Sequence, residues 1–123
     1  MIPWQVYMEV SAVVPLSERN QTIDDTLAQF LNYEHGKFDL YYDQLDSLEL
    51  IKYDYGSYLI TEPIDIEAEL RRVPEGDFEL CCALLTMLFR EDHFDNGSFD
   101  YRVERGDVKL IVERMRDLIR EAE

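Results

Sequence analysis

Apolar and polar side chains alternate along residues 4–14. One face of this segment carries its apolar side chains: Trp4, Val6, Met8, Val10, Ala12 and Val14. A period of two residues with several β-branched members predicts a half-buried strand. Pro15 is expected to end that strand, because proline cannot donate a backbone hydrogen bond to a neighbour.

The pattern changes after a polar stretch at residues 16–21, which we interpret as a loop. Thr22 is a suitable N-cap, and apolar residues then recur at helical spacing: Ile23, Leu27, Phe30 and Leu31. We expect this helix to end near Glu34, with Gly36 supplying a left-handed cap.

Residues 37–62 are rich in aromatic side chains. The segments Leu48–Asp54 and Ser57–Thr61 indicate two strands, joined by a hairpin turn at Asp54-Tyr55-Gly56. Phe38–Asp43 fits either a third strand or a helical turn, and we favour a strand because Tyr and Phe suit a pleated surface.

The remainder of the chain has a helical pattern. Asp65, Asp77, Ser98 and Asp107 are placed to cap four helices, and Gly76 and Gly106 to end two of them. The helix after Asp77 is apolar on every side over residues 78–89, which predicts a central, fully buried position. The last helix is amphipathic, with apolar residues at i, i+3, i+4 and i+7 spacing: Val108, Ile111, Val112, Met115, Leu118 and Ile119.

These elements predict an α+β fold. We expect one domain over residues 1–123, with a small antiparallel sheet from the N-terminal half packed against about four C-terminal helices. The adjacent Cys81 and Cys82 cannot bridge without distorting the helix, so we expect buried, reduced thiols and a cytoplasmic location. The first residues lack the pattern of a signal peptide.

The charge is strongly negative. The 123 residues include 27 acidic and 12 basic side chains, for a net charge of −15. Such a surface repels phosphate, so we expect no direct binding to nucleic acid or to an anionic membrane. It favours solubility and basic protein partners.

Candidate catalytic and metal-binding residues are few. His35 and His93 are the two histidines, and both are expected to be structural or exposed. The turn at residues 92–100 lacks the ligand spacing of an EF-hand, although a looser ion site from Asp92, Asp95 and Asp100 stays open as an alternative. We predict no catalytic residue, no metal ion and no cofactor.

One region combines tyrosine with acidic side chains. Residues 38–69 contain nine acidic residues and one basic residue, and five of the eight tyrosines fall within 41–58. Tyrosine is common at interfaces because it is large, rigid and amphipathic. The candidate partner-binding residues are Tyr41, Tyr42, Asp43, Asp46, Tyr53, Asp54, Tyr55 and Tyr58. The alternative is that these are half-buried structural residues.

The segment Leu84–Gly97, followed by Gly106-Asp107-Val108 and a final helix to Leu118, resembles a family of small uncharacterised bacterial proteins. The resemblance covers residues 80–119. It implies a bacterial or phage source and supports the helical interpretation of this half, but it supplies no catalytic residues. In the physical interpretation, Arg90 pairs with its helix carbonyls or with Asp92 or Asp95, and Phe94 and Phe99 fasten the turn to the core.

The function expected from these observations is a non-enzymatic protein–protein interaction module of the inhibitor, immunity or nucleic-acid-mimic type. Its partner would be a basic protein. Two alternatives stay open: a small metal-dependent enzyme using His93 and the 92–100 turn, and a homo-oligomeric structural module such as a homodimer.

Overall fold

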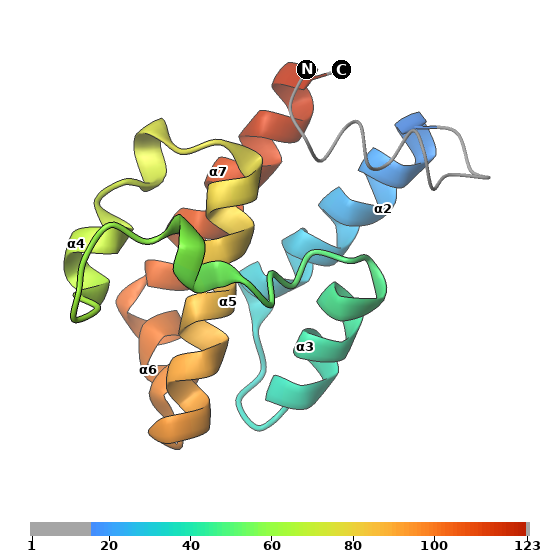
Figure 1. The fold of residues 1–123 in the computed structure, drawn as a ribbon. Coiled ribbons are helices and arrows are strands. Elements are labelled where there is room, and N and C mark those ends of the chain that lie inside the picture. Colours follow the sequence, from blue (N-terminus) through green and yellow to red (C-terminus); the bar gives the residue numbers. More distant parts are fainter. Residues whose placement is uncertain (1–15, 123) are drawn as a thin grey trace.

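The computed structural model describes residues 16–122, which form a bundle of helices (Figure 1). The α-helices are α2 (Leu16–Gln29), α3 (Phe38–Ser47), α4 (Ile66–Leu70), α5 (Phe78–Phe94), α6 (Ser98–Arg105) and α7 (Asp107–Ala122). Short 3-10 helices lie between them: η1 (Phe30–Asn32), η2 (Tyr55–Tyr58) and η3 (Val73–Glu75).

Helix α5 forms the centre of the bundle, as its uniformly apolar sequence predicts. Its N-terminus is capped by Asp77, whose carboxylate accepts a 2.8 Å hydrogen bond from the backbone N–H of Leu80. Every residue from Cys81 to Phe89 is buried. Helices α6 and α7 and the 3-10 helix η2 pack against α5, and Figure 1 shows α4 on one side of it and α2 and α3 on the other.

The C-terminal helices also match the pattern of the sequence. Gly97 and Gly106 have φ values of 93° and 88°, a left-handed conformation that favours glycine, and they flank α6. Gly97 and Gly106 directly precede α6 and α7, so the expected caps Ser98 and Asp107 are the first helical residues instead. Helix α7 buries the predicted apolar stripe except for Leu118, which is partly buried.

Ion pairs fasten four helices together around Arg102 of α6. Its side chain is 9% exposed and reaches Glu91 of α5, Glu67 of α4 and Asp107 of α7. Exposed Arg105 adds a second bond to Glu67 at 3.1 Å. The loop before α4 has its own anchor, because the fully buried carboxylate of Glu69 accepts hydrogen bonds from the backbone N–H groups of Ile60 and Thr61.

The α+β prediction is wrong, because the residues that the structure describes are helical and include no strand. The segment Phe38–Asp43, which we expected to be a strand, belongs to helix α3. The buried Tyr41 and Leu45, with half-buried Phe38 and Tyr42, follow helical spacing and pack against the core. Tertiary packing therefore outweighs the β-propensity of the aromatic residues.

The predicted hairpin is also wrong. Leu50 and Ile51 are buried in a segment without regular secondary structure, and no strand lies beside them within residues 16–122. The backbone N–H of Lys52 donates instead to the hydroxyl of Thr86 at 3.0 Å. The expected turn is the 3-10 helix η2. In these irregular segments, backbone N–H groups donate to side chains instead of to a neighbouring strand, and the strand pattern of the sequence does not reveal this.

The predicted boundaries at the beginning of the chain need correction as well. Residues 16–21, expected to be a loop, are the start of α2, and Thr22 is not its N-cap. The predicted end near Glu34 corresponds to η1, which extends α2 to Asn32, and Gly36 has the expected left-handed conformation with φ of 87°. The strand predicted at residues 4–14 lies outside the described residues. Within residues 16–122, no helix is both long and apolar enough to cross a membrane.

Candidate functional site

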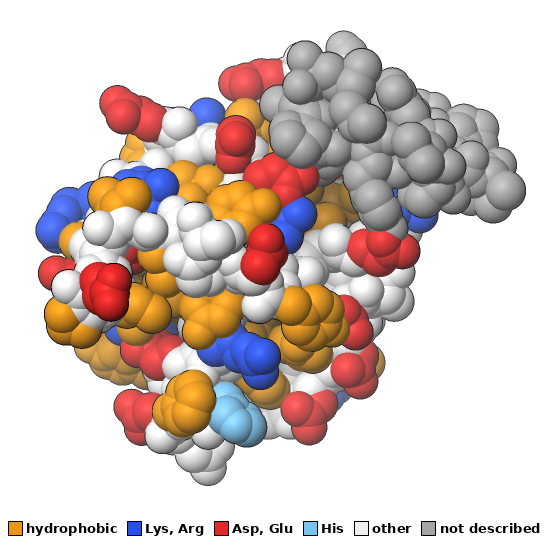
Figure 2. Space-filling view, viewed as in Figure 1, with side chains coloured by type: hydrophobic (Ala, Val, Ile, Leu, Met, Phe, Trp, Pro, Cys, Tyr) orange, Lys and Arg blue, Asp and Glu red, His pale blue; other side chains and the backbone are white. Residues whose placement is uncertain are grey.

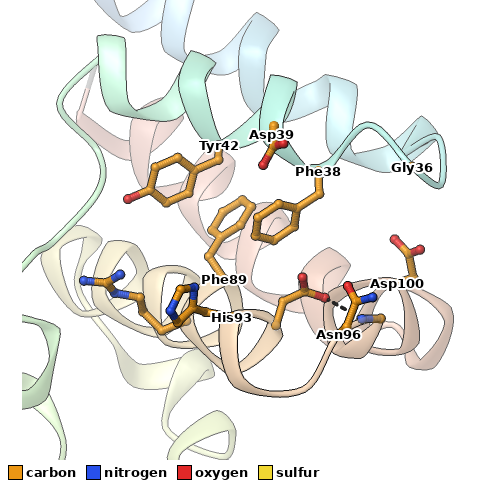
Figure 3. Close-up of a pocket in the computed structure, with 11 residues that line it drawn as sticks. Gly36, Phe38, Asp39, Tyr42, Phe89, His93, Asn96 and Asp100 are labelled. Carbon is orange, nitrogen blue, oxygen red and sulfur yellow. Dashed lines mark hydrogen bonds between the residues drawn. The ribbon is translucent and has the colours of Figure 1, made fainter.

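An open groove of about 730 Å³ lies between the first turn of α3, the end of α5 and the start of α6 (Figure 3). Charged and polar side chains surround it. The residues that line it are Gly36, Phe38, Asp39, Tyr42, Phe89, Arg90, Asp92, His93, Asn96, Gly97 and Asp100.

Aromatic rings form the floor of this groove. The ring of Phe89 lies 5.2 Å from that of Phe38 and 5.3 Å from that of Tyr42, and both pairs are edge-to-face. Beneath them, Phe89 stacks on buried Phe99 at 4.4 Å. Edge-to-face and offset stacking are the favourable ring geometries, so these contacts stabilise the packing of the floor.

The carboxylate of Asp92 is hydrogen-bonded to nearby backbone N–H groups. One of its oxygens accepts hydrogen bonds from the backbone N–H of Gly97 at 3.1 Å and of Phe99 at 2.9 Å. It thereby takes the capping role at α6 that Gly97, without a side chain, cannot provide. The groove does lie at the turn considered above as an ion site, and both Asp92 and His93 line it. Among residues 16–122, however, no three His, Cys, Asp or Glu side chains are placed to hold a metal ion.

Some of the other predictions for this turn are confirmed and some are wrong. Phe99 is fully buried and fastens the turn to the core, as predicted, whereas Phe94 is 86% exposed and does not. Arg90 forms no ion pair with Asp92, Asp95 or any other carboxylate of the described residues. The imidazole of His35 lies 3.8 Å from a carboxylate oxygen of Asp100.

Three of the eight candidate partner-binding residues do not belong to an exposed surface. Tyr41 is 7% exposed, with its ring 5.0 Å from that of Phe30. Tyr55 is packed against the core, and Tyr58 is half-buried where burial raises the pKa of its hydroxyl. For these three tyrosines, the structural alternative describes the observed environment.

Tyr42, Asp46 and Tyr53 do come together. The hydroxyl of Tyr53 donates a 2.7 Å hydrogen bond to the carboxylate of Asp46. This bond, with a smaller contribution from Tyr42, raises the pKa of Tyr53 to about 12. The Tyr53 ring is 65% exposed, so an aromatic surface faces solvent beside α3.

Carboxylates cover the same flank of α3. Asp39, Tyr42, Asp43 and Asp46 are spaced at i, i+3, i+4 and i+7, which places them on one side of a helix. Figure 2 shows acidic side chains gathered over α3 on the face viewed. We call Asp39, Tyr42, Asp43, Asp46 and Tyr53 the acidic–aromatic surface. Asp54 is exposed, and its side chain forms no hydrogen bond or ion pair with this group.

The cysteines are buried in α5 and free of any disulfide. Burial raises the pKa of the Cys81 thiol to about 12 and that of Cys82 well above its ordinary value. Both side chains therefore behave as apolar core residues, since the reactive form of cysteine is the thiolate.

Comparison with known proteins places the chain in a family. A family model matches residues 20–121. The chain belongs to the Family of unknown function (DUF6508). The match confirms the resemblance to a family without an assigned activity and extends it well beyond residues 80–119. No curated protein and no solved structure matches the chain.

The DUF6508 match spans the helices that build the groove and the acidic–aromatic surface. Sequence reasoning missed Asp39 as a member of this surface and did not place Arg90 in a groove. The signal for Asp39 was present, because residues 38–46 repeat their apolar and acidic positions at helical spacing. Arg90 carried no comparable signal, since the groove forms only when α3 packs across the end of α5.

Proposed function

We propose that this protein is a non-enzymatic interaction module that binds a basic partner protein through the acidic–aromatic surface and the adjoining groove. The observation that carries this proposal is the flank of α3, where three carboxylates share one side of the helix with Tyr42 and one of them, Asp46, bonds to the exposed Tyr53. The carboxylates of this arrangement can form ion pairs with a basic partner, and the tyrosine rings can pack against it.

The charges support a basic occupant. The chain carries 27 acidic and 12 basic side chains, and the cations of the described residues are mostly occupied by carboxylates of their own helices or neighbours. By contrast, Asp39 and Asp43 are exposed and have no ion pair within residues 16–122. Complementary charge accelerates encounter and excludes acidic competitors.

The aromatic rings support a protein as the occupant. Tyrosine and phenylalanine at an interface bury large apolar areas at little cost in side-chain entropy. Tyr42 links the two parts of the site, because it lines the groove and also stands between Asp39 and Asp46 on α3. Arginine side chains of the partner can therefore stack on a ring while they pair with a carboxylate.

The test compares two double variants of equal charge. The wild-type chain is used at low salt to capture a partner from a lysate of the source cells, and the captured protein is identified and purified. Binding is then measured for Asp43→Asn with Asp46→Asn, and for the matched control Glu75→Gln with Glu121→Gln, whose exposed carboxylates lie outside the surface.

We expect the captured protein to be basic and its affinity to fall about 5-fold in the surface variant, because each exposed ion pair contributes up to about 1 kcal/mol. The control should bind like the wild type, and 0.5 M salt should weaken all complexes. Equal loss in both variants, or a partner without excess positive charge, would contradict the proposal.

A further inference from the structure

Arg90 is an unpaired cation in a groove of an acidic protein. Its half-buried side chain lines the groove, and none of the carboxylates within residues 16–122 lies within ion-pair distance of it. Acidic residues outnumber basic ones 27 to 12, and nearby Arg102 engages three of them. The guanidinium of Arg90 is therefore available to an anionic group that enters the groove.

The groove has two electrically different ends. Successive residues of an α-helix are turned by about 100°, so Arg90 and Asp92 lie on opposite sides of Phe89. His93 falls on the side of Arg90, whereas the bonds of Asp92 to Gly97 and Phe99 tie it to the start of α6. Figure 3 shows His93 and Tyr42 toward one end of the groove and Asn96 and Asp100 toward the other, with Phe38 and Phe89 between them.

We propose that the groove holds a peptide segment of the partner that carries both charges. A carboxylate side chain of that segment pairs with Arg90, and a basic side chain lies over the aromatic floor and pairs with Asp100. This inference rests on the proposed function, because it names what the partner presents to the groove. The inference predicts that the basic partner also presents one acidic residue, which pairs with Arg90.

The surroundings of Arg90 favour a carboxylate over a phosphate. The planar guanidinium forms two parallel hydrogen bonds with either group. Asp39, Asp92 and Asp100 line the same groove, and their repulsion acts more strongly on a dianion than on a carboxylate. A carboxylate accompanied by a neighbouring cation is the occupant with the least repulsion.

The test uses two short peptides and NMR of the full chain. The probes are acetyl-Arg-Gly-Gly-Glu-amide and the same peptide with Gln in place of Glu. Backbone amides around the groove and the Arg90 side-chain N–H report binding. The proteins are the wild type, Arg90→Gln and the matched control Arg71→Gln, which removes the same charge from an exposed position outside the groove.

We expect the Glu peptide to bind the wild type about 3- to 5-fold more tightly than the Gln peptide, as an exposed ion pair allows. Arg90→Gln should abolish this difference, and Arg71→Gln should preserve it. Perturbed signals of Arg90 with the Glu peptide alone would locate the carboxylate.

Three results would overturn the inference. They are equal affinity of both peptides for the wild type, an unchanged difference in Arg90→Gln, and inorganic phosphate binding at Arg90 more tightly than the Glu peptide. The proposed function fails separately, through the matched Asp43/Asp46 and Glu75/Glu121 variants. If both peptides bind equally but the Asp43/Asp46 variant loses affinity for the captured partner, the proposed interaction module stands. The proposed pairing of a partner carboxylate with Arg90 is then wrong.

Discussion

The guanidinium of Arg102 meets the carboxylate of Glu91 through two parallel hydrogen bonds, 2.9 Å from Nε to Oε1 and 3.0 Å from Nη2 to Oε2. These bonds, offset partly by burial, raise the pKa of Arg102 and keep it charged. Arg102 also bonds to Glu67 and Asp107, so one side chain connects helices α4, α5, α6 and α7.

We expect Arg102→Met to lower the free energy of unfolding by about 3 kcal/mol, because it leaves partly buried carboxylates without their partner. Urea denaturation followed by circular dichroism measures this loss. The control is Arg105→Met, which removes an exposed cation that shares Glu67 and Asp107. Arg105→Met should cost much less, and similar losses for the two variants would contradict the central role of Arg102.

Protonation of Glu69 makes the free energy of unfolding depend on pH in the acidic range. Burial alone would raise the pKa of this carboxyl, but hydrogen bonds from Thr61, Arg72 and two backbone N–H groups outweigh burial and lower it. A lowered pKa stabilises the folded state above the ordinary glutamate pKa of about 4.3, and this stabilisation is lost as the pH falls through the lowered folded value.

We therefore expect the free energy of unfolding to fall as the pH decreases from 5 toward 3, and Glu69→Gln to flatten this dependence. Denaturation curves at half-unit pH intervals measure the slope. Glu75→Gln, which changes an exposed carboxyl nearby, should keep the wild-type slope. An identical slope in Glu69→Gln would show that other carboxyls govern acid unfolding.

The thiols of Cys81 and Cys82 should resist modification in the folded protein. Both are buried, and burial raises their pKa values far above neutral pH. We expect Ellman's reagent to react with them at least about 100-fold more slowly than with free cysteine at pH 8, and to reveal two thiols at once in guanidinium chloride. Rapid reaction in native buffer would place at least one thiol at the surface.

The hydrogen bond between Tyr53 and Asp46 should appear in a tyrosine titration. It raises the pKa of Tyr53 to about 12, because the Asp46 carboxylate accepts from the phenol and disfavours its ionised form. We expect Asp46→Asn to lower this pKa toward the ordinary value of about 10. NMR of the Cζ carbons measures it, and Asp54→Asn, which alters a neighbouring carboxyl, should leave it near 12.

The helices with clear caps and a regular apolar period could be predicted from the sequence. The apolar residues 78–89 and the cap Asp77 indicated α5, and the i, i+3, i+4, i+7 stripe indicated α7. These elements are long enough for the helical period to repeat several times, so the pattern is unambiguous.

Helix α3 could not be recognised in the same way. It spans only Phe38–Ser47. The residue with a left-handed φ after its end is Glu49, at 61°, and not the glycine that commonly marks the end of a helix. The aromatic residues Tyr41 and Tyr42 also have high strand propensity. A short helix without a glycine cap and rich in tyrosine therefore gives a pattern close to that of a strand.

The candidate site was predictable in composition but not in geometry. The bias toward tyrosine and carboxylate in residues 38–69 drew attention to the segment that contains α3, and Tyr42, Asp46 and Tyr53 lie together there. Tyr41, Tyr55 and Tyr58 pack into the fold, because which tyrosines face solvent depends on helix orientation. The groove requires α3 to lie across the end of α5, a tertiary contact between residues about 50 positions apart that no local pattern encodes.

The position of α5 has a consequence for the way this molecule opens. A helix with no polar side along residues 81–89 cannot be exposed on one side while the rest of the bundle stays closed, since each direction would bring apolar side chains into water. Its amide protons can therefore exchange with deuterium only when the surrounding helices separate together. Hydrogen exchange at Leu84 and Leu85 would then report the opening of the whole bundle, not the fraying of one element.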